Sequence, residues 1–216
     1  MRSHAIAALA AASAVLAPAH AMARAVTYPG GNMAMMEYTD ETFMVETMRT
    51  LTPTFAVGWH DEWDKEGDRQ FHGPMIAGLA KRWNNPDSQG NIFWMAGAGV
   101  AFDDVASAGA RSGAAGYLGV EADWENRRFY TQYAARATWA DSIDKTLSQR
   151  LRVGVAPYVA EAGALHTWAI VQIDHEPEDD RSVSVTPVIR LFKGSLLGEA
   201  GVSLDGDGFA SLMFYF

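Results

Sequence analysis

The feature that most constrains this sequence is the strict two-residue alternation of its final segment, residues 209–216. Apolar side chains occupy one set of alternate positions, Ala210, Leu212, Phe214 and Phe216, while Phe209, Ser211, Met213 and Tyr215 occupy the other. Successive side chains of a β-strand point to opposite faces of the sheet. The segment therefore predicts a strand with one strongly apolar face.

Segments with the same alternation recur along the chain and are separated by turn residues. They cover residues 32–36, 42–50, 54–63, 71–81, 91–102, 113–124, 128–139, 147–159, 165–174, 182–192, 196–204 and 209–216. No apolar run approaches the roughly 20 residues that a transmembrane helix needs. The pattern predicts an all-β chain of about twelve strands, with ten as the alternative.

An aromatic residue that closes a final strand of period two resembles the C-terminal signature of bacterial outer-membrane β-barrels. The resemblance implies an antiparallel, up-and-down transmembrane β-barrel. It also implies that Leu212, Phe214 and Phe216 form an assembly signal. The partners it implies are outer-membrane lipid and the barrel assembly machinery.

The start of the chain agrees with export. Arg2 is followed by an apolar stretch over residues 5–17 and by small-residue cleavage options around Ala21 and Ala23. We therefore expect a signal peptide over residues 1–23, which is cleaved, and a barrel domain over residues 24–216. The expected location is the outer membrane.

The expected connections between strands alternate in character. Longer or acidic ones cover residues 61–70, 103–112, 140–146, 175–181 and 205–208, and shorter ones cover 51–53, 84–90, 125–127, 161–164 and 193–195. Outer-membrane barrels have short periplasmic turns and longer outer loops. The alternation therefore supports the barrel independently of the final aromatic residue.

Charge and cysteine content exclude several classes of partner. The chain has 26 acidic and 17 basic residues and no cysteine. An acidic surface argues against nucleic acid, whose phosphates require a basic face. Thiolate metal sites are excluded.

Placing the apolar residues outward turns a set of charged side chains into the lumen. These are Glu121, Asp123, Arg136, Arg150, Arg152, Arg190 and Glu199. Charges at membrane depth are costly unless they are paired or hydrated. The set is interpreted as a salt-bridge network that fills a narrow lumen, or alternatively as a ladder that lines a pore or contacts a ligand. We expect Arg136 to pair with Glu121 or Asp123 on the neighbouring strand.

Tyrosines near strand ends, Tyr117 and Tyr133 among them, predict interfacial aromatic girdles.

Three groups of residues suggest a copper or zinc site. His60, Asp61 and Glu62 end one strand and His72 opens the next, His175 lies in a second acidic cluster, and Met33, Met35 and Met36 are closely spaced. Imidazole and carboxylate suit zinc or copper(II), and thioethers suit copper(I). The alternative is that the acidic residues are solvated loops and the methionines are packing residues. No other cofactor is expected.

A second resemblance involves three other segments of the chain. The Tyr28-Pro29-Gly30-Gly31 segment, the Lys81-Arg82-Trp83-Asn84 segment and the stretch from Leu165 to Pro177 resemble uncharacterised small barrels associated with heavy-metal resistance loci of Gram-negative bacteria. This resemblance implies metal handling and a metal-efflux system as partner.

The sequence therefore favours a small porin-like or metal-handling barrel with a polar, salt-bridged lumen. The alternatives are a structural or interaction barrel with a plugged lumen, or a lipid-modifying barrel enzyme. Outer-membrane phospholipases and deacylases place a Ser two residues after a His on one strand, and none of the four histidines after residue 23 has this neighbour. We therefore expect no enzyme activity.

Overall fold

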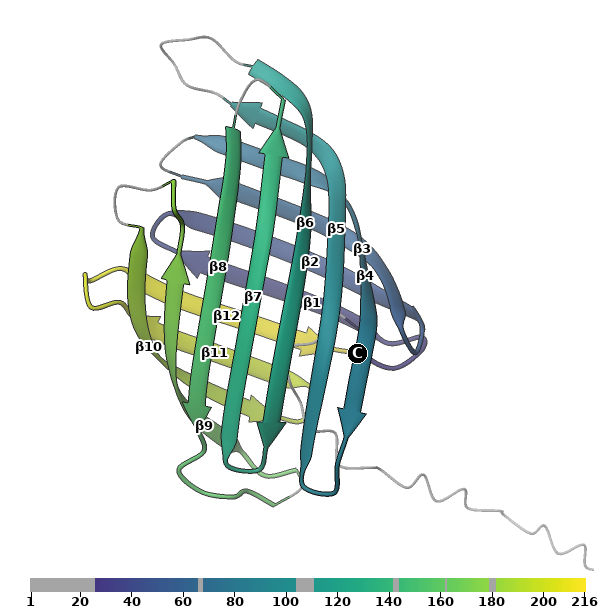
Figure 1. Ribbon diagram of the computed structural model, residues 1–216, viewed down its shortest axis with the longest axis vertical. Helices are drawn as coiled ribbons and strands as arrows, with labels where there is room; N and C mark the ends of the chain where they lie inside the picture. Colours follow the sequence, from purple (N-terminus) through teal and green to yellow (C-terminus); the bar gives the residue numbers. More distant parts are fainter. Residues whose placement is uncertain (1–25, 66–67, 104–110, 142–143, 162, 179–181) are drawn as a thin grey trace, which may run out of the picture.

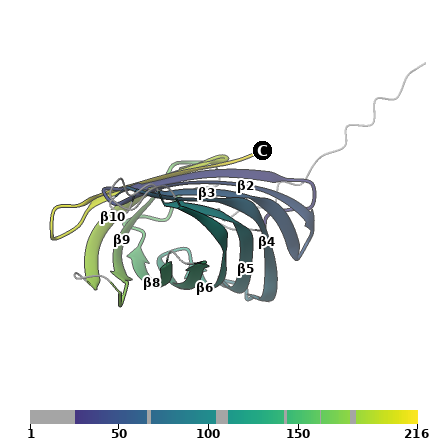
Figure 2. The same ribbon diagram turned by 90° about the horizontal axis from the view of Figure 1, so that it is seen from above.

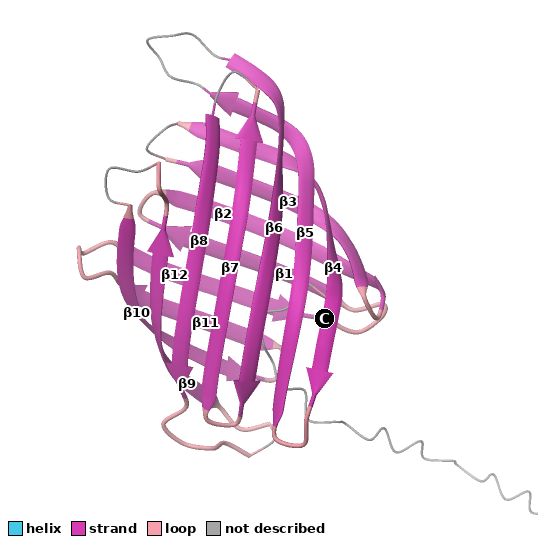
Figure 3. Ribbon diagram, viewed as in Figure 1, coloured by secondary structure: helices cyan, strands magenta, loops and turns pink. Residues whose placement is uncertain are grey.

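The computed structural model describes residues 26–65, 68–103, 111–141, 144–161, 163–178 and 182–216. These residues form twelve strands and contain no helix long and apolar enough to cross a membrane (Figures 1 and 3). The strands are β1 (Asn32–Thr39), β2 (Thr42–Thr52), β3 (Phe55–Asp64), β4 (Arg69–Asn84), β5 (Ser88–Asp103), β6 (Arg111–Asn126), β7 (Phe129–Ala140), β8 (Asp144–Val155), β9 (His166–His175), β10 (Val183–Lys193), β11 (Leu196–Val202) and β12 (Gly208–Tyr215).

Each strand pairs antiparallel with its neighbours in the sequence, and β1 pairs with β12 to close the barrel. The prediction of an all-β, up-and-down barrel with about twelve strands is confirmed. In Figure 1 the long strands β4–β8 cross in front of β1–β3 and β10–β12 at a steep angle. Seen from above, the barrel is flattened rather than round (Figure 2).

Several strand boundaries differ from the prediction by up to three residues, and the largest difference is at the end of β8. β8 ends at Val155 rather than at residue 159, so the connection to β9 covers residues 156–165 and is not the tight turn expected at 161–164. Pro157 accounts for the early end, because proline has no amide hydrogen to donate to a strand ladder. Tyr158 consequently lies in this connection, where its hydroxyl donates to the carbonyl oxygen of Leu165 at 2.9 Å.

The two ends of the barrel can be defined by their connections. The closing end holds Phe216 and the β2–β3, β4–β5, β6–β7, β8–β9 and β10–β11 connections, and the opposite end holds the other six. At the closing end the backbone amide of Asn32 donates to the Phe216 oxygen at 2.7 Å, and the Phe216 amide donates to the Asn32 oxygen at 3.1 Å.

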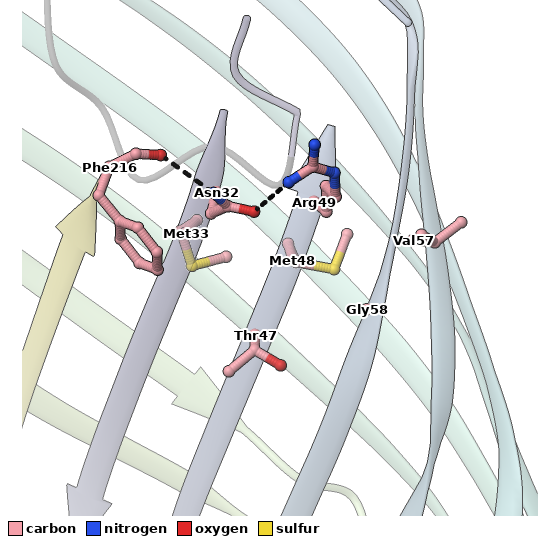
Figure 4. Close-up of a pocket in the computed structure, with 8 residues that line it drawn as sticks. All are labelled: Asn32, Met33, Thr47, Met48, Arg49, Val57, Gly58 and Phe216. Atoms are coloured by element: carbon pink, nitrogen blue, oxygen red, sulfur yellow. Dashed lines mark hydrogen bonds between the residues drawn. The ribbon is translucent and has the colours of Figure 1, made fainter. Parts of the chain in front are cut away.

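Side chains reinforce this seam. Arg49 Nη1 donates to Asn32 Oδ1 at 3.3 Å, and Asn32 Nδ2 in turn donates to the Phe216 oxygen at 3.4 Å (Figure 4). A cavity of about 210 Å³ lies beside these residues, lined also by Met33, Met48 and Gly58. The side chains of Arg49 and Asn32 thus connect β2 and β1 to the backbone oxygen of Phe216 where the barrel closes.

The strands have an apolar outer face and a mixed inner face. Outward side chains that are large, apolar and exposed include Leu118, Val120, Leu151, Val153, Ile189, Leu191, Leu212 and Phe214. On the inner face, buried apolar side chains gather mainly on β1, β2, β4, β5, β11 and β12, and they include Met33, Met48, Met75, Phe93, Leu197 and Met213. We call this set the apolar wall. A second, smaller cluster of buried apolar side chains on the inner face consists of Tyr130, Ile170, Val188 and Phe209. The polar inner positions are described next.

Candidate functional site: the polar interior

Inward side chains form one continuous polar row across seven consecutive strands, from β10 to β4. Its members occupy directly paired positions: Thr186, Gln172, Arg152, Gln132, Asp123, Asn91 and Arg82. We call this row the polar ladder. All of these side chains except Arg82 are buried. Because the strands are tilted, a row of paired positions travels along the barrel axis as it passes from strand to strand.

Hydrogen bonds connect neighbours in the polar ladder. Arg82 Nε donates to Asn91 Oδ1 at 2.6 Å, and Asn91 Nδ2 donates to Asp123 Oδ1 at 2.6 Å. On the other side, Arg152 Nε donates to Gln172 Oε1 at 2.8 Å. These bonds give partners to the Asn91 amide, Asp123 Oδ1 and Gln172 Oε1, as the burial of polar groups favours.

Three charged residues form the centre of the interior. Arg190 Nε lies 2.6 Å from Glu199 Oε1, and Arg152 Nη1 lies 3.1 Å from Glu199 Oε2, so one carboxylate joins two guanidinium groups. The Arg190 guanidinium also stacks over Tyr130 at 4.5 Å from the ring centre. Tyr130 donates from its hydroxyl to Gln132 Oε1 at 2.8 Å, which connects this centre to the polar ladder.

Arg150 lies at the floor of a polar cavity at the opposite end. Its Nε donates to Asp174 Oδ1 at 2.6 Å and its Nη1 donates to Glu37 Oε1 at 2.9 Å. The cavity measures about 310 Å³ and is bounded by the β1–β2, β9–β10 and β11–β12 connections. We call it the vestibule. Gln172 and Thr186, which belong to the polar ladder, also line it.

The vestibule carries an acidic lining. Its carboxylates are Asp40, Glu41, Asp174, Glu176, Asp205 and Asp207. Among the described residues that line it, Arg150 is the single cationic side chain. A concave surface lined by one sign of charge concentrates small ions of the opposite sign, so the vestibule attracts cations.

A second interior network involves Arg136. Its Nη1 lies 2.8 Å from Glu62 Oε2, and its guanidinium stacks over Tyr117 at 4.2 Å. His60 Nε2 lies 3.0 Å from the same Glu62 oxygen, and His60 Nδ1 lies 2.8 Å from Glu46 Oε1. Arg136 therefore reaches from β7 across the lumen to β3.

The expected pairing of Arg136 with Glu121 or Asp123 is wrong. The β6–β7 register places Arg136 opposite Gly119, while Glu121 and Asp123 face Ala134 and Gln132. Glu121 instead hydrogen-bonds Gln132. In a flattened barrel the opposite wall is close enough for a long side chain to reach, and this changes the partner. Tyr117 was expected in an outer aromatic girdle, but its ring points inward and stacks against the Arg136 guanidinium.

The histidines do not form a shared metal site. The β3–β4 register pairs Asp61 with His72, while His60 is opposite Gly73. His60 and Glu62 therefore face the lumen, whereas Asp61 and His72 lie on the outer face, where His72 Nδ1 is 2.7 Å from Asp61 Oδ1. The prediction that both imidazoles reach one ion is wrong, because alternate strand positions point to opposite faces.

The other expected metal ligands are also separated. His175 Nδ1 lies 3.0 Å from Gln149 Nε2 at the end of β9. Met33 and Met35 point inward, and Met33 belongs to the apolar wall, whereas Met36 is exposed on the outer face. Among the described residues, no group of three histidine or carboxylate side chains is arranged to hold a metal ion.

The remaining expected residues lie as follows. Glu121, Asp123, Arg136, Arg150, Arg152, Arg190 and Glu199 all lie on the inner face. Leu212, Phe214 and Phe216 are exposed on the outer face, where the Phe214 and Phe216 rings stack at 5.5 Å. The expected signal peptide, residues 1–23, is outside the described residues.

Several interior residues were not singled out from the sequence. They are Glu37, Glu46, Arg82, Asn91 and Gln172. Alternation predicts the face of each residue, but only the cross-strand register shows that Arg82, Asn91 and Asp123 are consecutive neighbours. Their inward position could have been recognised where a polar residue lies between two outward apolar residues, as Gln172 does between Val171 and Ile173.

Together these observations define the class of molecule: a closed twelve-stranded β-barrel with an apolar exterior and a charged interior. No protein-family model and no curated sequence matches the chain. Similar solved structures include the KdgM porin, with a TM-score of 0.48, 9% identity and coverage of 86% of this chain and 99% of that one.

Two further structures have similar coverage. The KdgM porin in complex with disordered oligogalacturonate has a TM-score of 0.49 and 7% identity, over 86% of this chain and 98% of that chain. The β-domain of the Bordetella autotransporter BrkA has a TM-score of 0.35 and 9% identity, over 86% and 96%.

Proposed function

We propose that the chain is an outer-membrane β-barrel that provides a narrow, porin-like passage for small hydrophilic solutes. One observation carries the proposal: large apolar side chains cover the outer face, while charged and amide side chains continue across the inner face from β10 to β4. Lipid-exposed apolar residues that alternate with a polar interior are typical of transmembrane barrels.

The same geometry limits what can pass. Side chains fill the interior between the vestibule and the closing end, and Tyr117, Tyr130, Phe93 and Gln172 are fully buried there. A solute must therefore move along hydrogen-bonded polar side chains, so the passage is selective and has a low conductance. The transport of a metal ion as cargo is one case of this function and requires no resident metal site.

A sealed structural barrel is the second candidate, and the apolar wall favours it. Planar-bilayer recording of refolded protein separates the two. A passage predicts discrete current steps that are smaller than those of an open general porin. Folded, inserted protein that leaves the bilayer current unchanged would contradict the proposed passage and would establish the sealed barrel.

A further inference from the structure

We propose that the passage follows the polar ladder, that Arg152 forms its constriction, and that small hydrated cations are the preferred species. This inference rests on the proposed function and adds to it the route, the restricting residue and the class of solute. Three observations support it.

The first observation is that the polar ladder joins the two ends of the barrel. Thr186 and Gln172 are at once members of the ladder and part of the vestibule lining. At its other limit, Arg82 lies two residues before the end of β4, next to the connection to β5 at the closing end. A small ion can therefore keep polar partners along the whole length of this row.

The second observation is that the other polar row of the inner face is shorter and meets the ladder at Arg152. It consists of Glu37, Ser211, Glu199 and Arg190 on β1, β12, β11 and β10, and Glu199 contacts Arg152. The apolar wall contributes Met33, Met48, Met75 and Phe93, whose side chains are buried against one another and against Tyr117. An ion that loses its hydration shell against such side chains pays a large free-energy cost. The apolar wall therefore keeps a route for ions away from these side chains and along the polar positions that meet at Arg152.

The third observation concerns Arg152, which crosses the ladder near its middle. Its side chain is only 6% exposed. Its Nε donates a hydrogen bond to Gln172, and its Nη1 forms an ion pair with Glu199. It also lies over the Phe209 ring at 5.5 Å. The guanidinium thus occupies the space just beneath the vestibule and holds a positive charge in the path of an entering cation.

The charges along the route explain the preference for cations. Close to the ladder lie the carboxylates of Glu121, Asp123, Glu125 and Glu199 and the guanidinium groups of Arg82, Arg152 and Arg190. The carboxylates therefore exceed the cations by one even with Arg152 present. The acidic vestibule precedes them and raises the local cation concentration. Removal of Arg152 increases this excess of carboxylate along the route.

The direct test is single-channel conductance and reversal potential in a potassium chloride gradient for Arg152→Ala. We expect at least a threefold rise in conductance and a shift of the reversal potential toward the potassium equilibrium value. Met75→Ala is the matched control, because it removes a buried interior side chain from the apolar wall and should leave both quantities unchanged. An equal rise in Met75→Ala would overturn the route, because truncation anywhere in the lumen would then suffice.

A second test does not depend on Arg152 and uses the absence of cysteine from the chain. In Gln132→Cys, a charged methanethiosulfonate reagent should react and block the current, whereas Met75→Cys should keep its current. A block at Met75→Cys with no block at Gln132→Cys would contradict the ladder route while leaving a passage in place. Loss of current in every folded variant and in the unmodified protein would instead contradict the proposed function.

Discussion

Arg190 and Glu199 face each other directly on β10 and β11, with Nε 2.6 Å from Oε1 and both side chains almost completely buried. Removal of one member of a buried ion pair leaves an uncompensated charge and typically costs about 3–5 kcal/mol. We expect Arg190→Ala to lower the free energy of unfolding by about 3 kcal/mol, because Arg152 still contacts Glu199. Denaturant titration of the barrel in lipid vesicles measures this change.

The control for that experiment is Lys193→Ala, which removes an exposed cation from the end of the same strand. It should change stability by less than about 0.5 kcal/mol, as surface substitutions usually do. If Arg190→Ala were equally mild, the Arg190–Glu199 pair would not stabilise the interior.

The partner of Arg136 can be identified by double-mutant cycles. Arg136 contacts Glu62 at 2.8 Å, while Glu121 contacts Gln132. We expect Arg136→Ala and Glu62→Gln to be coupled by about 1 kcal/mol, and Arg136→Ala and Glu121→Gln to be additive. Coupling with Glu121 in place of Glu62 would restore the neighbouring-strand pairing that the structure contradicts.

The outer face can be tested with a charge. Leu118 is 59% exposed on β6, far from either end of the strand. An arginine at a lipid-facing position near the bilayer midplane costs about 2–4 kcal/mol, so Leu118→Arg should destabilise the barrel in vesicles by that amount.

Leu204 provides the matched control. It is 76% exposed in the β11–β12 connection, outside the strands. Leu204→Arg should be close to neutral. Equal and small effects at both positions would mean that Leu118 faces water.

The seam between β12 and β1 supports a prediction about assembly. Phe216 pairs with Asn32 through backbone hydrogen bonds and stacks on Phe214 on the outer face. We expect Phe216→Asp to reduce the amount of assembled barrel in cells, because it places a charge on the lipid face at the closing seam. Phe216→Tyr should assemble normally. Quantification of the folded, heat-modifiable band checks this, and equal amounts in both variants would mean that the aromatic side chain is dispensable.

Much of the fold could be predicted from the sequence because barrel strands have a period of two. In β10, the outward positions of Val183, Ile189 and Leu191 and the inward position of Arg190 follow directly from alternation. The end of β8 could not be placed in the same way, because alternation continues past Val155 and the backbone effect of Pro157 decides the boundary.

The contacts in the interior were less predictable. Which face Arg136 occupies depends on its own strand, but its contact with Glu62 depends on how the barrel is flattened, since 74 residues separate the two. The expectation that His60 and His72 share one ion was wrong for a similar reason. Nearness in a hairpin suggested that His60 and His72 meet, but the β3–β4 register turns them to opposite faces. Export of the chain and its recognition by assembly machinery stay predictions.

The proposed passage requires that the barrel is embedded in the outer membrane with its apolar face in lipid. Membrane fractionation of cells that express the full chain tests it most directly. We expect the protein to be recovered with outer membranes, to resist extraction by high salt and to migrate faster in detergent gels before heating than after. Recovery of folded protein in the soluble periplasmic fraction would contradict the proposed location.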